Sequence, residues 1–239
     1  DGIRRAKALP DCFSLSARDK GERALAVKYT KATIDTACKL NARAVVLHCG
    51  RVEVRDYTRD LISLYVAGKI ASPEAAALIA KMREEREEKI DYHLPMALQS
   101  LEKLSDYAVK RNIKIGIENR FYFREIPSFE ETGKILKILK RRNIYYWHDT
   151  GHAQLWEDLG FVKHLNCLDS YSAFLLGVHF HDIKEGRDHM APLKGSLDFE
   201  MFKPYLKADT LKTLEGHYPA TAEEIISAKD FLEKIYGPD

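Results

Sequence analysis

Short apolar runs alternate with long amphipathic stretches along most of the chain. The runs are residues 44–47, 113–117, 144–147 and 175–178, with weaker ones at 12–15 and 210–214. Runs of about four to eight residues, rich in branched and aromatic types, are typical of strands, and the strongest of them of buried parallel strands. Strands that alternate with helices predict an α/β protein with parallel strands and right-handed crossovers.

Several of the intervening stretches carry helix start signals. Ser128–Glu131 and Thr221–Glu224 both fit the capping box, in which a hydroxyl and a carboxylate satisfy free amide groups. Ser72-Pro73 offers an N-cap before a proline at the first helical position. From there to about Arg111 the pattern predicts a nearly continuous helix with a break near His93–Pro95.

The ends of the predicted strands carry metal-competent side chains. These residues are His48, Glu118, Asp149, His179 and Glu215. A (β/α)8 TIM barrel gathers all its strand ends around one mouth, whereas an open sheet spreads them along a line. We therefore expect a single α/β TIM-barrel domain over residues 1–239. Six runs are two short of eight strands, so either the first one or two strands precede Asp1 or the pattern hides them.

Composition narrows the class of protein. The chain is 45% hydrophobic and 31% charged, which is an ordinary globular balance. Lys and Arg number 38 against 36 Asp and Glu, and this near-neutral balance does not favour nucleic-acid or membrane binding. No apolar run reaches the roughly 18 residues that a membrane span requires. The four Cys form no CxxC pair, so we expect reduced thiols in a cytoplasmic protein.

Histidines concentrate around the strand ends. The chain has nine, and those in or beside strand ends are His48, His148, His152, His179, His181, His189 and His217. Imidazole and carboxylate groups bind zinc, manganese, iron or cobalt, so the pattern predicts a divalent-metal site. Structural alternatives remain: Asp149 as a helix N-cap, Glu118 paired with Arg120, and two core histidines at His179 and His181.

Taken together, these motifs resemble the xylose-isomerase-like TIM-barrel superfamily, which includes sugar-phosphate isomerases and epimerases and endonuclease IV. The matching pieces are Leu47–Gly50, Ile117–Asn119, Asp149–Ala153, His179–Asp182, the loop from His189 to Gly195, and Leu214-Glu215. They span residues 47–215, so the resemblance covers most of the chain. Their order is specific for the superfamily and not for one activity within it.

The resemblance implies a set of ligands. The central metal would be held by Glu118, Asp149, His179 and Glu215, and the further metals of the endonuclease branch by His48, His152 and His189 with Asp188. Two departures concern that branch. The segment Phe13–Ala17 lacks the expected His, and Asp188 and His189 are adjacent where one residue normally separates them. The metal itself (Mn, Zn, Co or Mg) is left open.

The resemblance favours a metal-dependent sugar or sugar-phosphate isomerase or epimerase that moves a proton next to a carbonyl. Glu118 and Glu215 would be the acid/base pair. The residues expected to position hydroxyls or a phosphate are His181, Lys184, Arg120 and Arg187. One alternative is an endonuclease IV-like phosphodiesterase, and another is a non-catalytic, degenerate barrel. We expect a carbohydrate substrate, no nucleic acid or membrane, and a homo-oligomer if edge strands are exposed.

Overall fold

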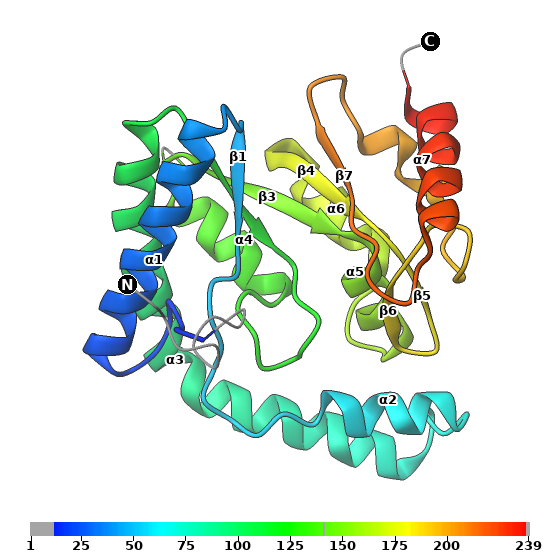
Figure 1. The fold of residues 1–239 in the computed structure, drawn as a ribbon. Helices are drawn as coiled ribbons and strands as arrows, with labels where there is room; N and C mark the ends of the chain where they lie inside the picture. The colour runs from blue at the N-terminus through cyan, green and yellow to red at the C-terminus, as the bar shows by residue number, and fades with distance from the viewer. Residues whose placement is uncertain (1–11, 141, 238–239) are drawn as a thin grey trace. The chain divides into compact units, whose positions relative to one another are not determined.

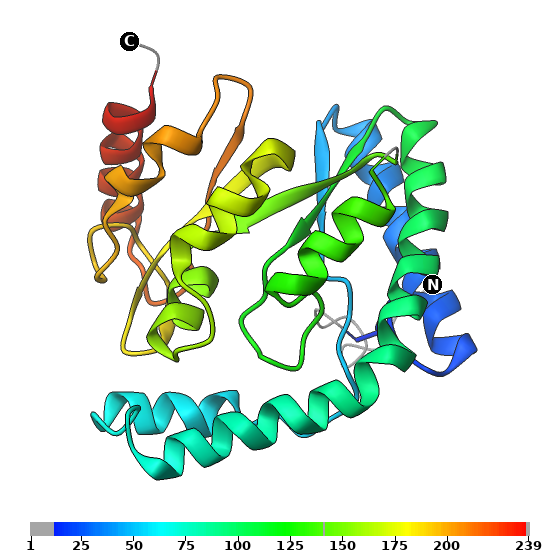
Figure 2. The same cartoon turned by 180° about the vertical axis from the view of Figure 1, so that it is seen from behind.

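The computed structural model describes residues 12–140 and 142–237 (Figure 1; Figure 2 from behind). The chain forms two compact units. The first comprises the described part of Asp1–Asp56 with Ala80–Glu118 and Tyr122–Tyr145. The second comprises Tyr57–Ile79, Asn119–Phe121 and the described part of Tyr146–Asp239.

The first unit pairs two parallel strands with helices. Its helices are α1 (Lys20–Lys39), most of α3 (Pro73–Val109) and α4 (Phe129–Ile138). Strand β1 (Ala44–Leu47) pairs with β2 (Lys114–Glu118) along its whole length. Figures 1 and 2 show α1 and α3 side by side, where the Tyr107 hydroxyl donates to Asp35 at 3.0 and 2.9 Å. The predicted strands at 44–47 and 113–117 are therefore confirmed.

Helix α3 continues through Pro95, so the expected break near His93–Pro95 is wrong. A proline inside a helix removes one backbone donor, and the helix persists where tertiary contacts hold both sides. Here the His93 ring Nδ1 lies 2.9 Å from the carbonyl of Ser16, and the Ser100 hydroxyl donates to the carbonyl of Leu15 at 2.7 Å. Both hydrogen bonds lie within the first unit and join residues far apart in the sequence, so the pattern of neighbouring residues could not predict them.

The weakest predicted strand, at 12–15, is wrong, because this segment forms bends and a turn. Side chains satisfy the backbone groups that a strand would pair. The amide of Ser14 donates to Glu22 Oε1 at 2.9 Å, and the amide of Ser16 donates to the Ser14 hydroxyl at 3.3 Å. Serine hydroxyls that bond nearby backbone groups compete with the sheet in this way.

The second unit carries the remaining strands and most of the candidate site. Its helices are α2 (Thr58–Val66), α5 (Thr150–Asp158), α6 (His164–Tyr171) and α7 (Ala222–Tyr236), with 3-10 turns at 172–174 and 199–205. Strand β4 (Leu175–Phe180) lies between β3 (Ile144–Asp149) and β7 (Leu211–Leu214), parallel to both. The register pairs Asp149 with His179, so the strand ends lie level. The strands expected at 144–147, 175–178 and 210–214 are confirmed.

A hairpin that the sequence pattern did not predict follows β4. Strand β5 (Asp182–Lys184) pairs antiparallel with β6 (Arg187–Met190). Its two turn residues, Glu185 and Gly186, have φ of 54° and 72°. Positive φ at both central positions is typical of the tight turns that match strand twist. The hairpin brings Asp188 and His189 back toward the end of β4.

The predicted helix starts are confirmed. Both capping boxes form, at Ser128–Glu131 and Thr221–Glu224. The Ser72 hydroxyl accepts from the amide of Ala75 at 3.2 Å, where α3 begins. Each cap satisfies amides that would otherwise lack a partner.

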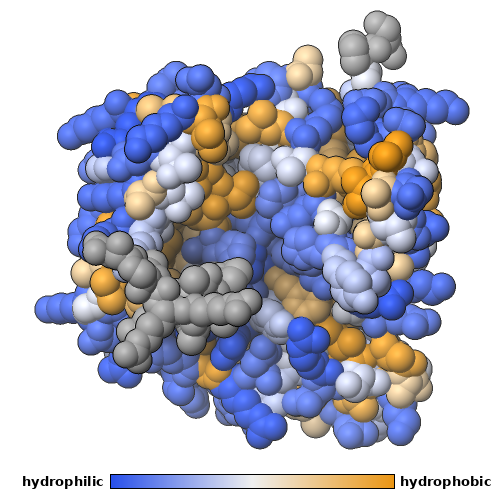
Figure 3. Space-filling model, in the orientation of Figure 1, coloured by the Kyte–Doolittle hydropathy of each residue, from blue (hydrophilic) through white to orange (hydrophobic). Residues whose placement is uncertain are grey.

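The surface agrees with the charged composition. Polar and charged side chains cover most of the face in Figure 3, with smaller apolar patches between them. Among the helices that the structure describes, none combines the length and apolar character needed to cross a bilayer.

Candidate functional site

Asp149, His179 and Glu215 meet at the carboxyl ends of β3, β4 and β7. His179 Nδ1 lies 2.9 Å from Glu215 Oε2 and 3.8 Å from Asp149 Oδ2. Donor atoms held about 2.1 Å from one ion in tetrahedral or octahedral geometry are about 3.0–3.4 Å apart. Two carboxylates and one imidazole are also the donor types that zinc and manganese bind. The donor types therefore fit a divalent cation, and the two distances lie on either side of the spacing that a bound ion would impose.

Asp149 does two things at once. It is fully buried, and its Oδ1 accepts the amide of His152 at 2.8 Å, which makes it the N-cap of α5. The His181 ring Nε2 lies 2.8 and 3.0 Å from its two carboxylate oxygens. Asp149 is thus a helix N-cap, as the structural alternative predicts. It also remains part of the candidate site, because its Oδ2 faces His179.

Glu118, the fourth residue of the predicted central set, belongs to the first unit. Its buried side chain lies 3.3 Å from His48 Nε2, measured from Glu118 Oε2. The register pairs Leu47 with Ile117, so the next residues, His48 and Glu118, lie level at the ends of β1 and β2. The first unit therefore brings together two of the predicted ligands.

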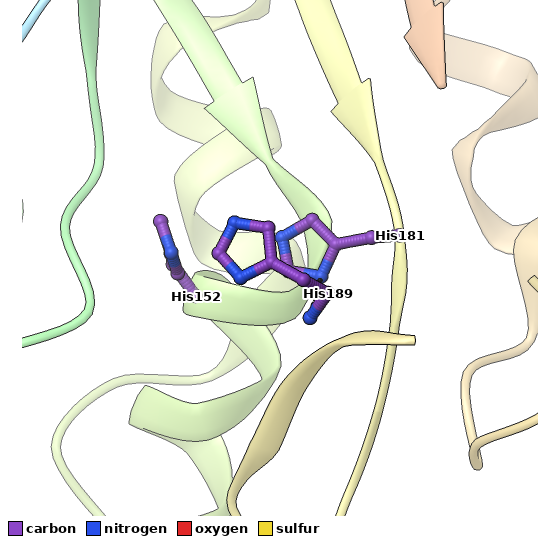
Figure 4. Close-up of side chains that lie close together, drawn as sticks. All are labelled: His152, His181 and His189. Atoms are coloured by element: carbon purple, nitrogen blue, oxygen red, sulfur yellow. Dashed lines mark hydrogen bonds between the residues drawn. The ribbon is translucent and has the colours of Figure 1, made fainter. Parts of the chain in front are cut away.

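Three imidazoles gather on the second unit (Figure 4). His152 comes from α5, His181 from the residue after β4, and His189 from the hairpin. The rings of His181 and His189 stack at 4.3 Å with an angle of 9°. Two parallel rings cannot both point a nitrogen lone pair at one ion between them. His181 Nε2 is bonded to Asp149, and its Nδ1 accepts the amide of His189 at 2.9 Å, so its contacts favour positioning over coordination.

A second donor set consists of His152, Asp188 and His189. Asp188 Oδ2 lies 2.9 Å from His189 Nδ1 and 3.7 Å from His152 Nε2. Asp188 and His189, which are adjacent in the sequence, therefore both lie near His152. Burial raises the pKa of Asp188, but hydrogen bonds from His152 and His189 outweigh it and the net pKa is well below its usual value.

His189 is held in an unusual backbone conformation. Its φ is 54°, which non-glycine residues rarely adopt. Its amide is bonded to the His181 ring, its carbonyl accepts the amide of His217 at 3.0 Å, and its ring stacks on His217 at 4.0 Å. Burial alone would lower the pKa of His189, but Asp188 outweighs it and raises the pKa. Surroundings that fix a residue in such a conformation are common at functional sites.

The four residues predicted to position substrate do not share one environment. Arg120 and His181 are buried, whereas Lys184 and Arg187 lie exposed on the hairpin. The Arg187 guanidinium lies 3.9 Å from the sulfur of Met190. Their role in binding stays a prediction.

Asp182 has a role that the sequence did not reveal. Its buried carboxylate accepts backbone amides of Ile183, Gly195 and Leu197 at 2.9, 2.8 and 3.0 Å. A Cβ on Gly195 would lie 2.2 Å from Asp182 Oδ1, so glycine is needed there. The carboxylate thus anchors the loop after the hairpin.

His148 differs from the other strand-end histidines. It is fully buried, and its Nε2 lies 3.0 Å from Nε2 of the buried His164. Burial brings the pKa of His148 well below its usual range and that of His164 to about 4. Side chains alternate along a strand, so the neighbour of Asp149 points to the opposite face. That alternation was the available signal that His148 packs in the core.

Comparisons with known proteins place the chain in a family. A model of the xylose isomerase-like TIM barrel matches residues 2–235. The chain is similar to 3-keto-D-glucoside 4-epimerase from E. coli in its apo form, at 16% identity and a TM-score of 0.67, over 93% of this chain and 75% of that one. It is also similar to D-allulose 3-epimerase from Methylomonas sp. in complex with D-allulose, at 15% identity and a TM-score of 0.67, over 93% and 73%.

A third similar structure contains a metal. It is the IOLI protein with a bound zinc atom, at 16% identity and a TM-score of 0.62, over 94% of this chain and 73% of that one. Likeness at such identities shows a shared fold. No curated protein matches the chain. The family match spans nearly the whole chain, and the protein therefore belongs to the xylose isomerase-like TIM barrel family.

Proposed function

We propose that this protein is a metal-dependent sugar or sugar-phosphate isomerase or epimerase that transfers a proton next to a carbonyl. The observation that carries the proposal is the convergence of Asp149, His179 and Glu215 at level strand ends. Two of the similar structures are sugar epimerases, one of them with bound D-allulose, which supports a carbohydrate substrate.

Asp149, His179 and Glu215 would hold the cation, and the resemblance adds Glu118 as the fourth ligand. A bound divalent cation would polarise a substrate carbonyl and stabilise negative charge on its oxygen. His179 Nδ1, which lies 2.9 Å from Glu215 Oε2, is the nitrogen that would face the cation.

Two carboxylates would move the proton. Glu215 is 30% exposed at its side chain, whereas Glu118 is 3% exposed. Two carboxylates in different surroundings suit the two roles that proton transfer needs. One carboxylate would take the proton from carbon and the other would return a proton to the substrate. Such general acid/base groups typically contribute about 10²- to 10⁴-fold in rate.

The test is solvent deuterium incorporation into ketoses such as D-allulose, followed by NMR, with metal content measured on the same samples. We expect one divalent ion per chain and exchange at the carbon beside the carbonyl. Glu215→Gln should lose at least about 100-fold in exchange rate. Glu233→Gln is the matched control, because Glu233 is exposed on α7 and pairs with Lys229 at 2.7 Å. An active Glu215→Gln enzyme would overturn the assignment.

The second donor set favours one other candidate, a multi-metal phosphodiesterase. Asp188, His189 and His152 would provide ligands for an additional ion, since Asp188 lies 2.9 Å from His189 and 3.7 Å from His152. Two or three clustered ions would suit in-line phosphodiester hydrolysis. Two or three zinc ions per chain, with cleavage of a phosphodiester panel and no ketose exchange, would replace the isomerase proposal. Absence of metal after incubation with Mn and Zn would favour a non-catalytic barrel.

A further inference from the structure

Asn119 forms a closed pair of hydrogen bonds with the backbone of Asp149. Its Oδ1 accepts the Asp149 amide at 2.8 Å, and its Nδ2 donates to the Asp149 carbonyl at 2.9 Å. A side-chain amide that bonds both backbone groups of one residue imitates a neighbouring strand. The main chain that carries the Asp149 carboxylate is therefore fixed by a single side chain.

The same residue orients His152. The main-chain carbonyl of Asn119 lies 3.1 Å from His152 Nδ1, and a carbonyl oxygen can only accept a hydrogen bond. Nδ1 therefore carries a proton, which leaves Nε2, the nitrogen that faces Asp188 at 3.7 Å, as the atom that would bind a cation. A backbone carbonyl that fixes the tautomer of a metal-binding imidazole is a common supporting contact.

The contacts of its oxygen keep the Asn119 amide from turning over. The buried Tyr146 hydroxyl lies 3.1 Å from Asn119 Oδ1 and 2.8 Å from His148 Nδ1. The Asp149 N–H group can only donate, so the Asn119 atom that it bonds must be oxygen. The nitrogen is then left facing the Asp149 carbonyl.

We infer that Asn119 is a positioning residue of the metal site, which holds Asp149 and His152 in the arrangement needed to bind a cation. The inference rests on the proposed function, since it assumes that Asp149 is a ligand. Neither nitrogen nor oxygen of the Asn119 side chain is needed as a ligand. Its side chain would act through the backbone of Asp149, and its main-chain carbonyl through the tautomer of His152.

Asn119→Asp tests the effect, because it changes one amide nitrogen to oxygen without changing shape, and its added negative charge would by itself favour cation binding. The new oxygen faces the Asp149 carbonyl, so an attractive contact becomes repulsive while the acceptor for the Asp149 amide remains. Loss of such supporting contacts typically weakens metal binding about 10- to 100-fold. We expect a loss of that size in Co²⁺ affinity, with altered intensity of the cobalt d–d absorption bands.

The matched control is Asn143→Asp. The Asn143 side chain donates to the carbonyl of Ile113 within the first unit, so the same chemical change is made at another strand carbonyl. We expect it to lower stability and to leave the cobalt spectrum and affinity unchanged. A purely structural role for Asn119 would make the two variants alike. Asn119→Ala, which lacks the repulsive oxygen, provides a folded variant for titration if Asn119→Asp unfolds.

The experiment is a Co²⁺ titration of the full chain, followed by absorption and calorimetry, with folding checked by circular dichroism. Wild-type binding with a weakened, spectrally altered Asn119→Asp variant supports the inference. Wild-type binding with an unchanged Asn119→Asp variant overturns the inference and leaves the proposed function standing. No Co²⁺ binding by the wild type overturns both.

Discussion

The buried pair His148 and His164 makes a strong prediction about acid stability. The two Nε2 atoms are 3.0 Å apart, so one ring must donate and the other accept. His164 Nδ1 lies 3.1 Å from Gln154 Oε1, which accepts and so leaves Nε2 of a neutral His164 as acceptor. Protonation of His164 would place two N–H groups against each other in a site without solvent.

The magnitude follows from the pKa of His164, which burial lowers from 6.5 to about 4. Because the folded pKa is below the unfolded one, the unfolded chain binds more protons between these values. The contribution of the neutral His164 to the free energy of unfolding is therefore fully present above about pH 6.5, and it is lost as the pH falls toward 4. One unit of pKa difference corresponds to about 1.36 kcal/mol, so this contribution is at most about 3.4 kcal/mol. About 2 kcal/mol of it is lost between pH 7 and pH 5. His148 also loses stability as the pH falls, since its pKa is lowered too.

The assay is urea unfolding at several pH values between 7 and 5, with a chelator present so that metal release does not contribute. His164→Gln should lose about 2 kcal/mol less than the wild type over this range. His217→Gln, which removes an exposed imidazole, should retain most of the wild-type loss. An equal loss in His164→Gln and wild type would refute the reasoning. So would a His164 Cε1–H resonance in NMR that titrates near pH 6.5.

Two further variants test the packing around the site. Gly151→Ala would place its Cβ 2.1 Å from Cε1 of the buried His181, so we expect a loss of about 1–3 kcal/mol in urea unfolding and weaker Co²⁺ binding; wild-type values would contradict the contact. Asp182→Asn would give up a charged acceptor of three amides, so we expect a loss of about 2–3 kcal/mol and faster hydrogen exchange over residues 191–198; unchanged exchange there would contradict its role as an anchor.

Much of the fold could be predicted because its signals are local. Five apolar runs form strands within a residue or two of the expected bounds, and both capping boxes form. The two predictions that were wrong concern segments held by contacts with residues elsewhere in the chain. The segment at 12–15 is a turn because serine side chains satisfy its backbone, and α3 passes through Pro95 because His93 and Ser100 are anchored on either side. No window of neighbouring residues contains those contacts.

The candidate site divides in the same way. Apolar strands that end in polar residues predict the grouping of Asp149, His179 and Glu215, since parallel strand ends lie level. The sequence offers the N-cap role of Asp149 only as an alternative to a ligand role, and it cannot show that both nitrogens of His181 are engaged. Those facts depend on ring orientation and tautomer, which are set only when the hairpin folds back.

Strand β3 connects the site to the core through its two faces. Asp149 faces His179, while Tyr146 and His148 lie on the other face, where they bond each other and His148 contacts His164 of α6. A rigid strand alone does not fix a side chain at its last residue, where the ladder ends. Asn119 bridges both faces, because one oxygen contacts the Tyr146 hydroxyl and the Asp149 amide. The buried polar network is therefore part of what the site requires, since its partners leave the Asn119 amide one orientation, the one that holds Asp149 in place.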